Sequence, residues 1–170
     1  MKKVSPAILA QFAVLVAMEV VLSRFLSINT WSLKIGFAFV PVAVAGMLYG
    51  PVQAGIIAAA ADLIGAMLFP SGPFFPGFTL TAFLGGVAYG LALHKKRGPL
   101  RIIAVVCVRE LLLSLLLNTL WICILSSTDF FATLIAGGRM FQCFGMIPVQ
   151  FVVISLVSNV IGRITAKRKV

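Results

Sequence analysis

The sequence has few charged residues, and acidic ones are the scarcest. Only 11% of its 170 residues are charged, and Asp and Glu number 4 against 14 Lys and Arg. A soluble domain usually carries about 25% charged residues, whereas 61% of this chain is hydrophobic. So few charges cannot cover a water-facing surface, which excludes a soluble domain. At about 20 residues for each spanning helix, the chain has room for up to six or seven membrane spans.

Residues that commonly carry catalysis are also scarce. The chain has a single histidine, His94, and 3 cysteines without a C-x-x-C pair, so we predict neither a metal site nor a disulfide framework. It lacks the G-x-x-x-x-G-K-[ST] loop, the G-x-S-x-G elbow and the H-E-x-x-H zinc motif. These absences exclude ATP binding through a P-loop and disfavour an enzyme, and we predict no cofactor.

The basic residues gather in three clusters, at the two ends and near the middle of the chain. No acidic residue interrupts a cluster, and the positive-inside rule explains such clusters without a nucleic-acid partner. With six spans, both termini and all three clusters fall on the cytoplasmic side. The clustered residues are Lys2, Lys3, Lys95, Lys96, Arg97, Arg101, Arg163, Lys167, Arg168 and Lys169.

We therefore expect an all-α integral membrane protein with six transmembrane helices and both termini in the cytoplasm. Residues 1–170 would form a single six-helix membrane domain. Pro41 falls inside a short second span, and Gly50-Pro51 makes a tight turn before the third. The approximate spans are 6–26, 35–49, 51–69, 78–93, 102–126 and 139–164.

Four basic residues lie outside the clusters: Arg24, Lys34, Arg109 and Arg139. Under this topology three of them, all except Arg109, lie near the outer mouth of the bundle. Trp31 lies between Arg24 and Lys34 in the first outer loop. Arg109 lies deeper, and we expect it to pair inside the bundle or to extend toward the inner surface.

Aromatic and polar side chains are predicted to complete a pocket below this cationic rim. The second outer loop, residues 70–77, is rich in proline and glycine and presents Phe74 and Phe75. Guanidinium groups suit carboxylate capture, and aromatic faces suit a flat heterocycle. The alternatives are that the two phenylalanines only anchor the loop at the interface, and that the ions only pair among themselves. The predicted polar and aromatic residues below the rim are Glu19, Asp62, Asn118, Trp121 and Gln142.

Strips of small residues on the first and third spans are candidate docking faces. Ala13 and Ala17 lie one turn apart on the first, and Ala54 and Ala58 on the third. Such strips allow close helix approach in membranes. A protein that binds a solute without visible means of energising transport is predicted to be a subunit of a larger transporter.

Two stretches of the chain form a recognisable pattern together with the Asn118–Trp121 segment: LSRFLSINTWSLKIGFAFVPVAVAGMLYGPVQAG, residues 22–55, and ADLIGAMLFPSGPFFPGFTLTAFLGGVAYG, residues 61–90. They resemble the folate-specific substrate-binding (S) components of bacterial energy-coupling factor (ECF) vitamin transporters. The resemblance implies a six-helix protein of the bacterial plasma membrane that binds one vitamin on the extracellular side. Delivery would occur by toppling of the whole S component in the membrane.

The resemblance also implies partners and ligand contacts. The partners would be a transmembrane coupling subunit, docked on the alanine-rich faces of Ala13, Ala17, Ala54 and Ala58, and two cytoplasmic ATPase subunits that hydrolyse ATP. A pterin would stack on aromatic residues, and the glutamate tail of folate would meet the cations. The predicted ligand-binding residues are Arg24, Trp31, Lys34, Phe74, Phe75, Asn118, Trp121, Arg139 and Gln142.

Other functions stay open at this point. An S component for riboflavin or a pyridoxine-like ring is the nearest alternative, although a neutral vitamin needs no outer cations. A small membrane-embedded enzyme and a purely structural membrane subunit are further alternatives. The missing catalytic set disfavours the enzyme, and polar stripes on the last two spans disfavour the structural subunit.

Overall fold

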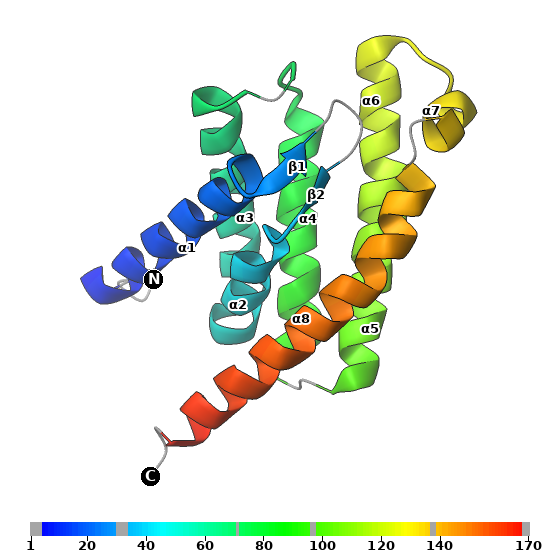
Figure 1. Cartoon of the computed structure of the whole chain (residues 1–170). Coiled ribbons are helices and arrows are strands. Elements are labelled where there is room, and N and C mark those ends of the chain that lie inside the picture. The colour runs from blue at the N-terminus through cyan, green and yellow to red at the C-terminus, as the bar shows by residue number, and fades with distance from the viewer. Residues whose placement is uncertain (1–4, 30–33, 71, 96–97, 137–138, 168–170) are drawn as a thin grey trace.

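Helices joined by short turns form most of the chain (Figure 1). The computed structural model describes residues 5–29, 34–70, 72–95, 98–136 and 139–167. The helical elements are α1 (Pro6–Arg24), α2 (Phe39–Tyr49), α3 (Pro51–Leu68), α4 (Pro76–Leu93), α5 (Pro99–Cys107), η1 (Val108–Leu117), α6 (Asn118–Ser126), α7 (Phe130–Ala136) and α8 (Arg139–Lys167).

Prolines mark where several helices begin. α1, α3, α4 and α5 each start with a proline in the first turn. Proline is favoured there because its missing N–H would have no partner within the helix anyway. The turn between α2 and α3 uses Gly50, whose φ of 94° is accessible to glycine at little cost. The sequence therefore fixes these boundaries locally.

Several helices have the length and composition of membrane spans. Four of the described helices qualify, namely α1, α3, α4 and the Arg139–Ile164 part of α8, and α2 is a shorter apolar helix. The elements α5, η1 and α6 follow one another directly from Pro99 to Ser126 and form one long column (Figure 1). The prediction of a helical membrane protein is confirmed at this level.

A two-stranded hairpin lies where the sequence predicted a plain loop. β1 (Ser27–Asn29) pairs antiparallel with β2 (Lys34–Gly36), and Ser27 lies opposite Gly36. A Cβ at position 36 would overlap the side chain of Ser27, so the pairing requires a glycine there. The first helix therefore ends at Arg24 and the second begins at Phe39, inside the bounds predicted for the first two spans.

Close packing of α3 on α4 organises one half of the bundle. A Cβ on Gly86 of α4 would overlap the backbone at Ala54 and Gly55 of α3. Ala54 and Ala58 are 0% and 1% exposed, since they lie inside the bundle. Their small side chains serve the packing of α3 on α4 within the chain, and the docking of a partner on these two alanines stays a prediction.

The other half packs α2, α4, α5 and α8 around one apolar core. Phe39 and Met47 of α2 lie against Tyr89 and Leu93 of α4, and Ile154 of α8 belongs to the same cluster. α8 runs diagonally across these helices (Figure 1). The polar cavity described below is lined by α2, α4 and α8 of this half, together with α1 and α3.

Candidate functional site

A polar cavity of about 290 Å³ lies inside the bundle. Its walls come from α1, α2, α3, α4, η1, α6 and α8, from the hairpin and from the loop before α4. Such a volume is near the lower end of small-molecule sites. The lining residues are Glu19, Arg24, Ser27, Gly36, Ala38, Phe39, Asp62, Ala66, Gly72, Pro73, Phe74, Phe75, Phe78, Thr81, Ala82, Arg109, Glu110, Leu113, Ser114, Asn118, Ile122, Arg139, Gln142, Met146 and Gln150.

Charges that are scarce in the chain are concentrated around this cavity. Three of the lining residues are acidic, out of 4 Asp and Glu in the whole sequence, and three are arginines. Ionisable groups inside a membrane protein are costly and commonly mark a ligand or ion site. These residues are Glu19, Asp62, Glu110, Arg24, Arg109 and Arg139.

Four side chains from three elements form a hydrogen-bonded network that we call the floor: Tyr89, Arg109, Glu110 and Gln150. Oε1 of Glu110 accepts hydrogen bonds from Nε2 of Gln150 at 2.6 Å and from Nη1 of Arg109 at 3.1 Å. The Tyr89 hydroxyl donates to Oε1 of Gln150 at 2.9 Å. The guanidinium carbon of Arg109 lies 5.5 Å from the Tyr89 ring centroid, which closes the network.

The floor is deeply buried and its members support one another. Tyr89, Glu110 and Gln150 are 0%, 2% and 1% exposed. A buried charge is tolerated when it is paired and hydrogen-bonded, and a satisfied buried network is rigid. Of the two alternatives predicted for Arg109, pairing inside the bundle or extension toward the inner surface, the structure shows the first, as an ion pair with Glu110. The floor therefore presents a fixed set of polar groups to the cavity.

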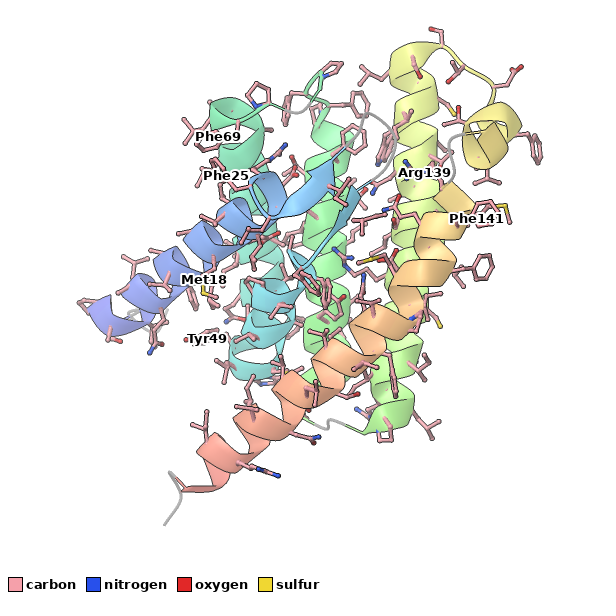
Figure 2. All side chains as sticks on the ribbon, in the orientation of Figure 1. Met18, Phe25, Tyr49, Phe69, Arg139 and Phe141 are labelled. Atoms are coloured by element: carbon pink, nitrogen blue, oxygen red, sulfur yellow. The ribbon has the colours of Figure 1, made fainter. Side chains whose placement is uncertain are left out.

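A π-helical segment, η1, carries the two charged residues of the floor. η1 contains Arg109, Glu110 and Ser114, and π-helical turns are rare and frequent at functional sites. Arg139, at the first turn of α8, donates from Nη2 to the carbonyl oxygen of Ser114 at 2.7 Å. Figure 2 shows Arg139 beside the η1–α6 column. Arg139 is buried, so it lies within the cavity wall rather than on an exposed rim.

Asn118 carries a buried acceptor that faces no donor in the described part of the chain. It begins α6 and lines the cavity, and its Oδ1 is buried without a hydrogen-bond partner among the described residues. Leaving such a group unpaired costs about 1–3 kcal/mol. A ligand with an N–H group would remove this cost.

A second group of lining residues, which we call the mouth, comprises Arg24, Phe74 and Phe75. Arg24 is the last residue of α1, and the two phenylalanines precede α4. Phe74 is 50% exposed. Asp62 lies in the adjacent wall, where its Oδ2 accepts a hydrogen bond from Thr79 at 2.8 Å.

Trp121 lies behind the cavity wall, and Phe75 lies between it and the cavity. The two ring centroids are 5.5 Å apart, and Trp121 is absent from the described lining residues. Its Nε1 donates to Oγ1 of Thr81 at 3.0 Å, and Thr81 donates to the carbonyl oxygen of Gly77 at 3.0 Å. In this conformation Trp121 holds Phe75 in place.

The structure brings together six of the nine predicted ligand-binding residues: Arg24, Phe74, Phe75, Asn118, Arg139 and Gln142. Trp31 and the side chain of Lys34 lie outside the described residues. The prediction missed Tyr89 and Thr81, whose only signal was a hydroxyl in an otherwise apolar helix. It also predicted no role for Gln150, which shares a helix face with Arg139 and Gln142.

The fold and the cavity define a membrane transport component, and the family comparison agrees. Residues 8–166 match the model of the family described as "ECF transporter, substrate-specific component", so the chain belongs to this family. It is also 37% identical to the folate transporter FolT of Clostridium novyi (strain NT), over 100% of this chain and 97% of the relative.

Two further comparisons point the same way. The folate transporter FolT of Leuconostoc mesenteroides subsp. mesenteroides is 37% identical over 68% of this chain and 63% of the relative. A crystal structure of FolT bound with folic acid superposes with a TM-score of 0.86 at 35% identity, covering 91% of this chain and 94% of that chain. The chain is therefore a homologue of FolT, and the family predicted from the sequence is confirmed.

Proposed function

We propose that this chain binds folate from outside the cell and is the substrate-binding subunit of an ATP-driven ECF importer. The observation that carries the proposal is a cavity lined by three arginines and by aromatic residues, in a chain with the fold of a folate-bound FolT. Folate has a flat pterin ring and a tail with two carboxylates. Aromatic faces suit the ring and guanidinium groups suit the tail.

The polar groups of the cavity support one orientation of the ligand. The carboxylate of Glu110 and the unpartnered Oδ1 of Asn118 are acceptors for ring N–H groups. The ring would therefore lie inside, between Phe75 and the floor, with the tail toward Arg24. Among the predicted contacts, Phe74, Gln142 and Arg139 line the same cavity. Trp31 and Lys34 remain proposed contacts from the first outer loop.

We further propose six membrane spans, with α2 and the α5–η1–α6 column added to the four long apolar helices. Both termini would lie in the cytoplasm of a bacterial cell, and residues 1–170 would be one membrane domain. The hairpin and the connections from α3 to α4 and from α6 to α7 lie at the end of the bundle away from the C-terminus (Figure 1). This end would be extracellular.

The partners would be a transmembrane coupling subunit and two cytoplasmic ATPase subunits, with delivery by toppling. Ala13 and Ala17 are exposed on α1, which lies at the edge of the bundle (Figure 1), so they are available for helix docking. Replacing both by tryptophan should abolish folate uptake by cells and leave folate binding by the purified protein unchanged. Uptake that survived this change would remove α1 from the docking face.

The function is tested by titrating the purified protein in detergent with folate and 5-formyltetrahydrofolate. Both should bind at micromolar concentration or below, while riboflavin, thiamine and pyridoxine should not. The arginine-lined cavity disfavours riboflavin and pyridoxine, which are neutral, because their binding would leave its charges without a matching ligand group. Thiamine is itself a cation and offers the arginines no anionic group. If one of these vitamins bound and folate did not, the chain would be an S component of another specificity.

A further inference from the structure

Gly65 of α3 lies directly against the guanidinium group of Arg24. A Cβ at position 65 would lie 2.7 Å from Nε, 3.2 Å from Nη2 and 3.3 Å from Cζ of Arg24. Carbon atoms in contact optimally lie about 3.5–4.0 Å apart, so even an alanine methyl group would overlap the guanidinium. Arg24 can occupy its place in the cavity wall only because residue 65 has no side chain.

This contact differs from those of the glycines that bring helices together. The nearest atoms to a Cβ on Gly86 or Gly90 all belong to the backbone of α3 and of the turn before it. At Gly65 the three nearest atoms all belong to the Arg24 side chain. Gly86 and Gly90 therefore serve helix packing, whereas Gly65 accommodates one functional side chain.

The backbone on both sides of this contact is held in place. The ring of Phe25 packs edge-on against that of Phe69, with centroids 5.0 Å apart and an interplanar angle of 71°. Figure 2 shows the two rings together at the ends of α1 and α3. The N–H of Phe69 donates to the carbonyl oxygen of Gly65 at 2.9 Å. A larger residue 65 would therefore displace the flexible Arg24 side chain and not the helices.

We propose that Gly65 is a positioning residue for ligand recognition. It lets the guanidinium of Arg24 lie across α3 at the mouth of the cavity, where Arg24 binds the acidic tail of the ligand. The inference rests on the proposed function, because the tail is that of folate. Bidentate binding of a carboxylate by arginine depends on geometry as well as charge, so a displaced guanidinium contributes much less to the affinity for the ligand.

The first test compares Gly65→Ala with wild type on two ligands, folate and its analogue with both tail carboxylates converted to amides. The Kd for folate should rise about tenfold, the loss of one charge-assisted hydrogen bond, and the Kd for the diamide should stay within about twofold. Gly145→Ala is the matched control, since a Cβ on that glycine of α8 would meet nothing within 4 Å, and it should change neither Kd. An equal loss for both ligands, or no loss for folate, would overturn the proposal.

The second test is a double-mutant cycle with Arg24→Ala. Without the guanidinium, Gly65→Ala should cause no further loss of folate affinity. A further loss in the Arg24→Ala background would mean that Gly65 acts through the packing of α1 on α3, which overturns the proposal.

Thermal unfolding in detergent, measured without ligand, separates this inference from the folate assignment. Gly65→Ala should lower the unfolding temperature when Arg24 is present and not when it is alanine. If Gly65→Ala does not fold, the double variant should restore folding, and failure to do so would count against the proposal. A wild-type protein that does not bind folate would instead refute the proposed function.

Discussion

The floor and the mouth of the cavity are built in different ways. In the floor, Glu110 accepts two hydrogen bonds from side chains, and its partners come from η1 and α8. All of its members except Arg109 are almost completely buried. At the mouth, Arg24 lies at the end of a helix, and Phe74 is half exposed in a short loop.

This difference suggests that the floor and the mouth have different roles in ligand binding. A satisfied buried network is rigid, so the floor can present fixed groups to a ring without rearranging. A long side chain at a helix end and a half-exposed phenylalanine lose more freedom on binding, so the mouth is suited to closing over a tail. Variants of the floor should therefore affect stability and all ligands, and variants of Arg24 at the mouth should affect only ligands with an acidic tail.

The largest effect is expected for Glu110→Ala in the floor. The change leaves the guanidinium of Arg109 and the amide of Gln150 without their common acceptor. Removing one partner of a buried ion pair costs about 3–5 kcal/mol. The unfolding temperature in detergent should fall markedly, and folate and its diamide should both lose binding. Glu110→Gln keeps an acceptor oxygen and should lose less stability and less ligand affinity than Glu110→Ala. A Glu110→Ala variant as stable as wild type would refute the structural role of the floor.

A smaller and more selective effect is expected for Arg24→Ala at the mouth. A hydrogen bond to a charged group contributes about 1.5–3 kcal/mol, so the Kd for folate should rise about 10- to 100-fold. The Kd for the diamide and the unfolding temperature should be nearly unchanged. Arg24→Lys keeps the charge but lacks the planar guanidinium, so its Kd for folate should lie between those of wild type and Arg24→Ala. Equal losses for folate and the diamide would show that Arg24 does not bind the tail.

The smallest effect is expected for Trp121→Phe. This change keeps an aromatic ring behind Phe75 but removes the N–H that donates to Thr81. A neutral hydrogen bond contributes about 1 kcal/mol, so the Kd should rise about fivefold for folate and the diamide alike. Thr81→Ser keeps the acceptor and serves as the control. A loss larger than that of Arg24→Ala would mean that Trp121 contacts the ligand directly.

The sequence predicted the parts of this molecule that depend on local chemistry. Apolar runs and helix-starting prolines located the helices. Arg24, Asn118 and Arg139, polar residues in otherwise apolar segments, were predicted to belong to one pocket, and all three line the cavity, although Arg139 lies in its wall and not at a rim. A charge or amide inside a membrane has few alternatives to facing the bundle interior. The internal pairing of Arg109 follows from the same argument.

The rest depends on how helices pack, which one sequence does not specify. Ala54 and Ala58 have the spacing of a docking strip, but a strip of small residues suits packing inside the chain and docking on a partner equally well. Nothing in residues 108–117 distinguishes a π-helix from an α-helix, and the hairpin requires Gly36 to meet Ser27 across the turn. The position of Trp121 behind Phe75 depends on the packing of α6 against α4, which the sequence does not show.

The division between floor and mouth is tested best by a structure of this protein with folate bound. We expect the pterin ring inside the cavity, within hydrogen-bonding distance of Glu110 or Asn118 and stacked near Phe75. The tail carboxylates should lie against Arg24 at the mouth. A tail that lay against Gln150 and the floor, with the ring at the mouth, would contradict the division between floor and mouth.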